Sequence, residues 1–231
     1  MAAKKSARVT GPAILICGAA AGKATPRYVK TFDEVWALNT CAKECGIKPD
    51  LVIAMDDLRR DHAADPAYCA KLFAGHKADV LTTVEYPEWP RAKAYPLAET
   101  IEALGVPLVL ARHLFDNSTN YALALAITRG ADHIGLHGVS FCFPDKPGGL
   151  EIYRTLDWAG TKYENAPDWF KYYGKYALSE RRPREPGIEA CHFLLGLAVE
   201  RGIAVSFGPK TTLLNLDREP YAYGFEEQPE L

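Results

Sequence analysis

The sequence predicts an α/β fold: a Rossmann-like, mostly parallel sheet of about six or seven strands with helices on both faces. Three observations support this prediction. Short apolar runs of strand length recur along the chain. Polar or glycine-containing turns follow several of these runs, as at the carboxyl edge of a parallel sheet. The stretch 117–141 contains a polar turn, an apolar helix, a glycine and a strand, in the order of half a βαβ unit.

Hydrophobic periodicity and flanking turn residues place the individual elements. Strands are predicted at 13–17, 35–39, 51–55, 80–84, 106–111, 133–139 and 203–207. Helices are predicted at 97–104, in the first half of 117–141, and at 189–200. We interpret 1–231 as a single nucleotide-binding domain with an aromatic-rich lid insertion at 142–187 and tails at 1–10 and 220–231.

The composition is that of a globular protein, with 48% hydrophobic and 24% charged residues. No apolar run approaches the roughly 20 residues that a membrane helix needs. A net charge of −2 gives no global basic field that would attract nucleic acid. The six cysteines are scattered and form no zinc-site pattern, so we expect buried thiols and a cytoplasmic location. The composition leaves open whether the chain forms a homo-oligomer.

The helix predicted within 117–141 is apolar nearly all round, which is typical of a buried helix. Its first residues carry hydroxyl and amide groups at the edge of the sheet where ligands bind. We predict that Ser118, with Thr119 and Asn120, faces a bound nucleotide. The alternative is that Asn117, Ser118 and Thr119 only cap the helix.

Two earlier strands end in residues suited to a nucleotide. Gly18 follows the first strand, where a glycine lets the backbone approach a phosphate or ribose, although GAAAGK matches neither phosphate-binding fingerprint. Asn39 ends the second strand and offers both a donor and an acceptor to a base or sugar. A plain strand-to-helix turn at Gly18 and a turn-forming role for Asn39 are the alternatives.

Acidic residues follow the third strand. Asp56 and Asp57 are predicted either to hold Mg²⁺ together with phosphate oxygens or to bind ribose hydroxyls. Asp57, Asp61 and Asp65 recur every four residues, so a solvated helix face explains them equally well.

Further candidates lie near the expected crevice. His113 precedes the central helix and is a candidate catalytic residue, with a solvated loop histidine as the alternative. The lid carries many tyrosines and tryptophans together with Arg181, Arg182 and Arg184. Tyrosine and arginine side chains suit phosphate and base recognition. We predict that this lid is mobile without ligand and orders over a nucleotide; packing on a partner subunit is the alternative.

The stretch 117–141 resembles a segment of the bacterial lipo-oligosaccharide sialyltransferases. It is also similar to a related group that comprises motility-associated glycosyltransferases and 6-hydroxymethylpterin pyrophosphokinases. The matching residues are Ser118, 122–127, Gly130 and 134–141. The chain departs from the pattern at Thr119, where the family usually has glycine, and at Ser140, where it often has aspartate.

The resemblance implies roles for several residues. In the sialyltransferases the turn at Gly18 and an asparagine after the second strand, here Asn39, contact the nucleotide. Their lid bears tyrosines that hold the donor phosphate, a role for Tyr173 and its neighbours, and a histidine base. Arg182 stands near that histidine's position, so the base has no match here. The pyrophosphokinases have an acidic pair and use Mg²⁺, whereas the sialyltransferases need no metal.

We therefore predict a nucleotide-dependent transferase, most like a glycosyltransferase that uses a nucleotide-activated sugar donor. Arg182, Tyr173 and His113 are its predicted catalytic residues. Gly18, Asn39, Asp56, Ser118, Thr119 and Asn120 are its predicted nucleotide contacts. A Mg²⁺-dependent pyrophosphokinase-like enzyme and a nucleotide-binding protein without chemistry are the alternatives.

Overall fold

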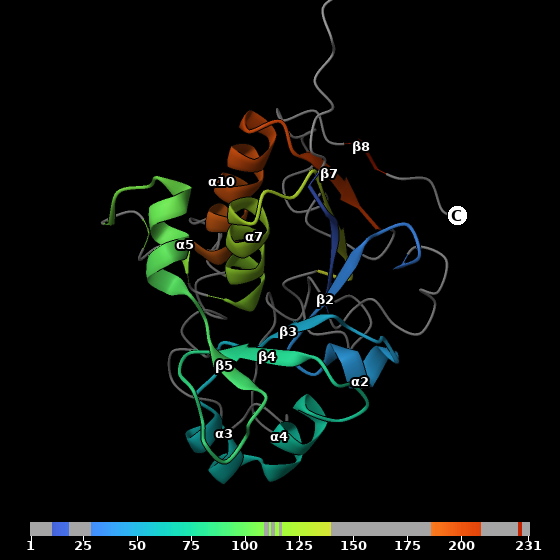
Figure 1. The fold of residues 1–231 in the computed structure, drawn as a ribbon, viewed down its shortest axis with the longest axis vertical. Coiled ribbons are helices and arrows are strands. Elements are labelled where there is room, and N and C mark those ends of the chain that lie inside the picture. The colour runs from blue at the N-terminus through green and yellow to red at the C-terminus, as the bar shows by residue number, and fades with distance from the viewer. Residues whose placement is uncertain are drawn as a thin grey trace, which may run out of the picture.

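A computed structural model describes residues 11–18, 29–108, 111, 114–115, 117–139, 186–208 and 226–227 of the chain (Figure 1). Within this part the strands form one sheet in the order β5-β4-β3-β2-β1-β6-β7-β8, and every neighbouring pair is parallel. The strands are β1 (Ala13–Cys17), β2 (Glu34–Leu38), β3 (Leu51–Ile53), β4 (Asp79–Thr82), β5 (Ala92–Ala94), β6 (His133–His137), β7 (Ala204–Phe207) and β8 (Glu226–Glu227). The predicted α/β, Rossmann-like fold is confirmed.

Helices cover the two faces of this sheet (Figure 1). One face carries α5 (Leu97–Leu104), α7 (Ser118–Thr128) and α10 (Pro186–Glu200). The other carries α2 (Cys41–Cys45), α3 (Leu58–Ala64) and α4 (Pro66–Leu72). Strand side chains alternate between the two cores: Ile14 and Ile16 pack toward α7, while Leu15 and Cys17 pack on the α2 side. A strand that is buried on both faces is therefore apolar at every position.

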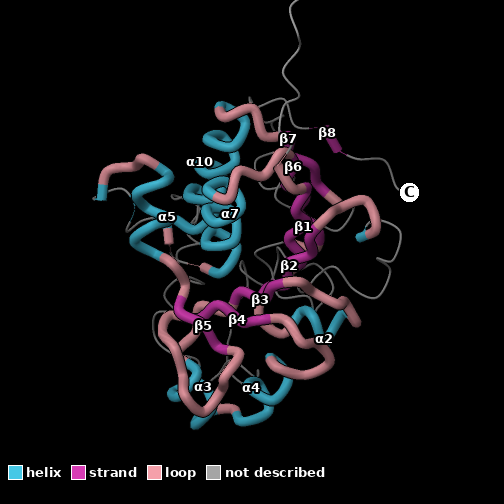
Figure 2. Tube along the Cα trace, viewed as in Figure 1, coloured by secondary structure: helices cyan, strands magenta, loops and turns pink. Residues whose placement is uncertain are grey.

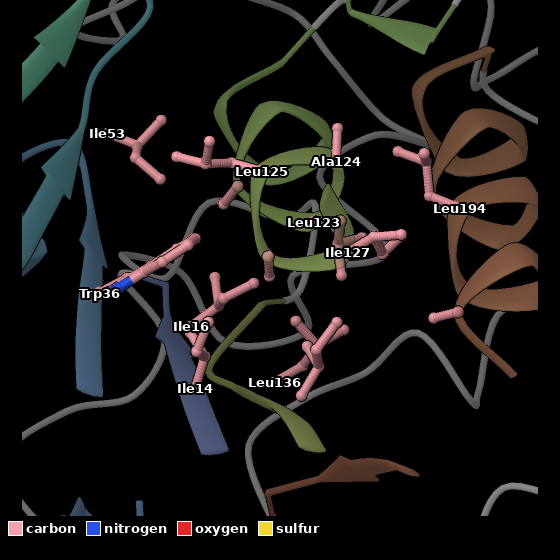
Figure 3. Close-up of a cluster of buried hydrophobic side chains, with 14 of the residues drawn as sticks. Ile14, Ile16, Trp36, Ile53, Leu123, Ala124, Leu125, Ile127, Leu136 and Leu194 are labelled. Carbon is pink, nitrogen blue, oxygen red and sulfur yellow. The ribbon is translucent and has the colours of Figure 1, made fainter. Parts of the chain in front are cut away.

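The core on the α7 face is built around that helix (Figure 3). Trp36, Ile53 and Ile16 extend from the strands toward α7, and Leu194 reaches it from α10. Leu123 of α7 has no exposed surface. An apolar helix between a sheet and other helices needs no polar face, which explains why its sequence is apolar nearly all round.

The predicted strand at 106–111 is wrong. Leu108 and Ala111 are helical, and the N–H of Ala111 donates to the carbonyl of Pro107 at 2.9 Å, as in a helical turn. Proline suits the start of such a turn because its fixed φ and missing N–H cost nothing there. The sheet instead contains β5, which the sequence did not predict. β5 is short and mostly exposed, so its sequence shows no apolar alternation.

The strand order reverses at β1. The chain adds β2, β3, β4 and β5 on one side of β1, and it then adds β6, β7 and β8 on the other. The N–H of Gly18, directly after β1, donates to the carbonyl of His137 at the end of β6 at 2.8 Å. In open parallel sheets, ligands bind outside the carboxyl ends of the strands at such a reversal.

Two predicted segments are only partly described. The lid at 142–187 lies outside the described residues except for Pro186 and Gly187, which begin α10. Within the predicted tail 220–231, Glu226 and Glu227 pair with β7. Among the described helices, none combines the length and apolar character needed to cross a membrane.

Candidate functional site

A polar contact joins three distant elements at the carboxyl edge of the sheet. The hydroxyl of Ser118, the first residue of α7, donates to Asn39 Oδ1 at 3.0 Å. The N–H of Met55, just beyond β3, donates to Ser118 Oγ at 3.4 Å. Residues separated by 79 and 63 positions in the sequence therefore meet at the carboxyl ends of β2 and β3.

The backbone of Asn39 is fixed in an unusual conformation. Its φ is 51°, and within the described residues it is the non-glycine residue with a positive φ. Its N–H donates to the carbonyl of Ile53 at 2.9 Å, which holds it against the end of β3. Asparagine tolerates the left-handed region better than most residues, and such conformations are concentrated at functional sites.

At the start of α7, the residue that caps the helix differs from the residue that contacts Asn39. Asn117 is the N-cap, and its side chain accepts from the N–H of Asn120 at 3.1 Å. Ser118 is thus free of the capping role, and its hydroxyl turns to Asn39 instead. Thr119 and Asn120, which we also predicted to contact a nucleotide, are buried. The positive end of the α7 dipole lies at Ser118 and suits a phosphate.

Gly18 is required for packing. A Cβ atom added there would lie 2.3 Å from the carbonyl oxygen of Gly138, which no side chain could tolerate. The carbonyl of Gly18 accepts a hydrogen bond from the Cys41 thiol at 3.1 Å. Close approach of the turns after β1 and β6 therefore explains a glycine here, and its predicted nucleotide contact stays a prediction.

Asp57 and Asp56 have different surroundings. Asp57 is exposed and caps α3, with its Oδ1 accepting from the N–H groups of Arg59 at 3.2 Å and Arg60 at 3.3 Å. Asp56 is half-buried and accepts a hydrogen bond at Oδ2 from the hydroxyl of Tyr68 on α4. Burial, as the largest cause, raises the pKa of the Asp56 carboxyl above its ordinary value.

These two carboxylates fit a magnesium ion poorly. One oxygen of Asp56 already accepts the hydrogen bond from Tyr68, which leaves a single free oxygen for a metal. One oxygen of Asp57 is already committed to the α3 cap. No group of three or more histidine, cysteine or acidic side chains that could hold a metal occurs in the described part of the chain. The magnesium site at Asp56 and Asp57 therefore stays a prediction.

Tyr68 was not among the predicted site residues, although the sequence carries a signal for it. Asp65 and Pro66 mark the start of a second helix only one residue after α3 ends. The side chain of Asp65 accepts from the N–H of Tyr68 at 3.1 Å, so α4 starts in a defined direction. The predicted catalytic residues His113, Tyr173 and Arg182 lie outside the described residues.

No protein-family model and no curated protein matches this chain. A crystal structure of a variant of the sialyltransferase CST-II in complex with CMP matches with a TM-score of 0.50 at 14% identity, over 88% of this chain and 84% of the other. The sialyltransferase CstII from Campylobacter jejuni in complex with CMP-3FNeuAc matches with a TM-score of 0.49 at 14% identity, over 93% and 88% of the two chains.

This chain has a sialyltransferase-like α/β fold. The likeness to the CMP complex extends over most of both chains. The resemblance to the sialyltransferases predicted from 117–141 is thus confirmed for the fold. At 14% identity the similarity establishes the fold and leaves the chemistry to be argued from the site.

Proposed function

We propose that this protein is a nucleotide-dependent transferase, most like a glycosyltransferase that uses a nucleotide-activated sugar donor. The observation that carries the proposal is the hydrogen bond from Ser118 to Asn39 at the carboxyl end of β2, the strand next to the reversal at β1. Open parallel sheets bind ligands outside the carboxyl ends of their strands, so two polar side chains at this edge support a nucleotide site there. The fold similarity to a sialyltransferase in complex with CMP supports a nucleotide monophosphate as the leaving group.

The edge of the sheet offers chemistry that suits this donor. The Asn39 amide, whose Oδ1 accepts from Ser118, keeps N–H donors for a base or ribose. The N-terminal turn of α7 attracts a phosphate through its dipole. In this proposal Tyr173 and Arg182 stabilise the negative charge that develops on the leaving phosphate, and His113 lies near the transferred group.

Nucleotide binding by two variants tests the proposal. Ser118→Ala and Asn39→Ala each remove hydrogen bonds worth roughly 0.5–1.5 kcal/mol, which corresponds to about 2- to 13-fold weaker binding of CMP. Thr128→Ala is the matched control, because Thr128 lies at the far end of α7 and, among the described residues, its hydroxyl donates to the carbonyl of Leu125 at 3.1 Å. Isothermal titration calorimetry measures the three affinities.

The double variant sharpens this test. Because the two side chains contact each other, their losses should not add, and the double variant should bind little worse than the poorer single variant. Wild-type affinity in both single variants would place the nucleotide elsewhere. Binding that needs Mg²⁺ and disappears in EDTA would favour the pyrophosphokinase-like alternative. Binding of a CMP-sugar without its consumption would favour a nucleotide-sequestering protein.

A further inference from the structure

Asp56 lies at the edge of the proposed donor site but on its other side. It directly follows Met55, whose N–H contacts Ser118 Oγ, so only one peptide separates it from that cluster. Its side chain turns toward α4, on the face of the sheet opposite α7. The donor contacts and the Asp56 carboxyl therefore lie on the two sides of the β3 end.

The carboxyl of Asp56 is held in one orientation. Tyr68 donates its hydroxyl hydrogen to Asp56 Oδ2. Burial, followed by the charge of Asp56, raises the pKa of Tyr68, so this phenol stays protonated and remains the donor. Within the described residues, the second carboxyl oxygen of Asp56, Oδ1, accepts no hydrogen bond. A fixed, half-buried carboxyl with one oxygen available is the arrangement that a general base requires.

We propose that Asp56 is the catalytic base of the transfer reaction and that Tyr68 is its positioning residue. This inference rests on the proposed transferase function and supplies the base for which the lid offers no histidine. In the step, the oxygen of an attacking hydroxyl forms a bond to the anomeric carbon of the donor sugar. The bond between that carbon and the phosphate oxygen breaks, and its electron pair leaves with the nucleotide monophosphate. The hydroxyl proton passes to Asp56 Oδ1.

The charges around Asp56 fit this role. Burial raises the pKa of the Asp56 carboxyl, the Tyr68 hydrogen bond lowers it, the Asp61 carboxylate raises it, and the Arg60 guanidinium lowers it. Arg60 and Asp61 lie on α3, while Tyr68 and the buried Cys69 lie on α4. A carboxyl whose pKa is moved toward the working pH is a stronger proton acceptor than an exposed one.

The same surroundings make a stability prediction. A carboxyl with a raised folded-state pKa contributes stability that is present below its unfolded pKa of 3.8 and is lost as the pH rises through the folded value. Ionisation of Asp56 therefore costs the fold stability as the pH rises. Asp56→Asn should lose less stability than wild type as the pH is raised from 3.8, whereas removal of a carboxylate that holds the structure together would give the opposite pH dependence.

The test measures CMP release from CMP-N-acetylneuraminic acid, with water as the attacking hydroxyl, together with the Kd for CMP. Asp56→Asn should lower CMP release by about 10²- to 10⁴-fold, a far larger change than any weakening of CMP binding that it causes. Asp79→Asn is the control, because Asp79 is an exposed aspartate at the amino end of β4. It should release CMP at the wild-type rate.

Tyr68→Phe separates positioning from a structural role. Loss of its hydrogen bond removes an influence that lowers the Asp56 pKa, so the acid limb of the rate profile should move to higher pH. A lower Tm with an unmoved acid limb would reduce Tyr68 to a packing residue and overturn that part of the proposal.

The two hypotheses fail in different ways. If Asp56→Asn releases CMP at the wild-type rate, Asp56 is not the catalytic base, but the proposed transferase function is unaffected. Failure of the wild-type protein to bind CMP or to release it from the CMP-sugar would overturn the proposed function, and the base with it. If CMP release by the wild-type protein requires Mg²⁺ and Asp56→Asn no longer shows this requirement, Asp56 is a metal ligand and the proposal is overturned.

Discussion

The two faces of the sheet carry helices of different kinds. On one face α7 and α10 span 11 and 15 residues, and α7 buries eight of its residues. On the other face α2, α3 and α4 span 5, 7 and 7 residues, and α3 buries only Leu58. The first face supplies a rigid, apolar support for Ser118. The second brings ionisable groups such as Asp56, Asp61 and Arg60 to the same edge of the sheet.

The difference between the faces assigns them different tasks. A helix packed on all sides cannot shift without opening the core, so the polar group at its first residue has a defined position. Short, partly exposed helices hold carboxylates near water, where their protonation can change. Figure 2 shows the loop between β4 and β5 beside α3, and the hydroxyl of Tyr86 in this loop accepts from the N–H of Leu58 at 3.1 Å.

The largest expected effect comes from removing one buried leucine from the hydrophobic core on each face of the sheet. Leu123→Ala in α7 should lower the free energy of unfolding by about 4–5 kcal/mol, because the surrounding layers cannot collapse into the cavity. Leu72→Ala in α4 removes an equally buried side chain, but it should cost only about 2–3 kcal/mol since this short helix can relax. Urea denaturation measures both. Equal losses would show that the two faces are equally rigid.

A smaller loss is expected at the reversal of strand order. Gly18→Ala places a methyl group against the carbonyl of Gly138 and should destabilise the fold by about 1–3 kcal/mol. Gly46→Ala is the comparison, because space is open there and only its φ of 68° opposes a side chain. Its loss should be about 1 kcal/mol. If Gly18→Ala is as stable as wild type, the turns after β1 and β6 do not pack closely.

The helix caps extend the comparison between the two faces. Asn117→Ala and Asp57→Ala each remove an N-cap and should cost roughly 0.5–2 kcal/mol. The loss at Asn117 should be the larger, because the exposed amides of α3 can bond to water when Asp57 is removed. Thermal unfolding monitored by circular dichroism measures both. A larger loss in Asp57→Ala would reverse the assignment of rigidity to α7.

The smallest effect lies at the amino end of β6, away from the site. Burial lowers the pKa of His133, whose ring lies 4.9 Å from that of Phe32 and shares a 2.7 Å hydrogen bond with Ser206. The stability that it contributes is present above its unfolded pKa of 6.5 and is lost as the pH falls through the folded value. His133→Gln should therefore lose less stability than wild type between pH 7 and 5 in urea titrations. An unchanged pH slope would contradict this.

Much of the fold could be predicted because apolar periodicity records burial. β1, β2, α7 and β6 were predicted nearly within their bounds, since each is buried and apolar. β5 was missed because two of its three residues are exposed and the pattern around them is that of a turn. At 106–111 the apolar run predicts a strand, whereas Pro107 begins a helical turn in the structure.

The candidate site was predictable only in part. Ser118 and Asn39 could be identified separately as polar residues at the ends of elements, but their hydrogen bond depends on strand order, which no local pattern encodes. Asp56 and Asp57 look alike in the sequence. Tertiary packing separates them, since one is half-buried against Tyr68 and the other caps α3 in solvent.

The outer strands of the sheet have a consequence for self-association. A parallel sheet with open edges can add strands from another copy, and natural proteins resist this with short, charged edge strands. β5 at one edge has three residues with an exposed Lys93 at its centre, and β8 at the other consists of Glu226 and Glu227. The exposed charge of Lys93 therefore protects the β5 edge against pairing with another copy. Replacing Lys93 with an apolar β-branched residue should remove that protection.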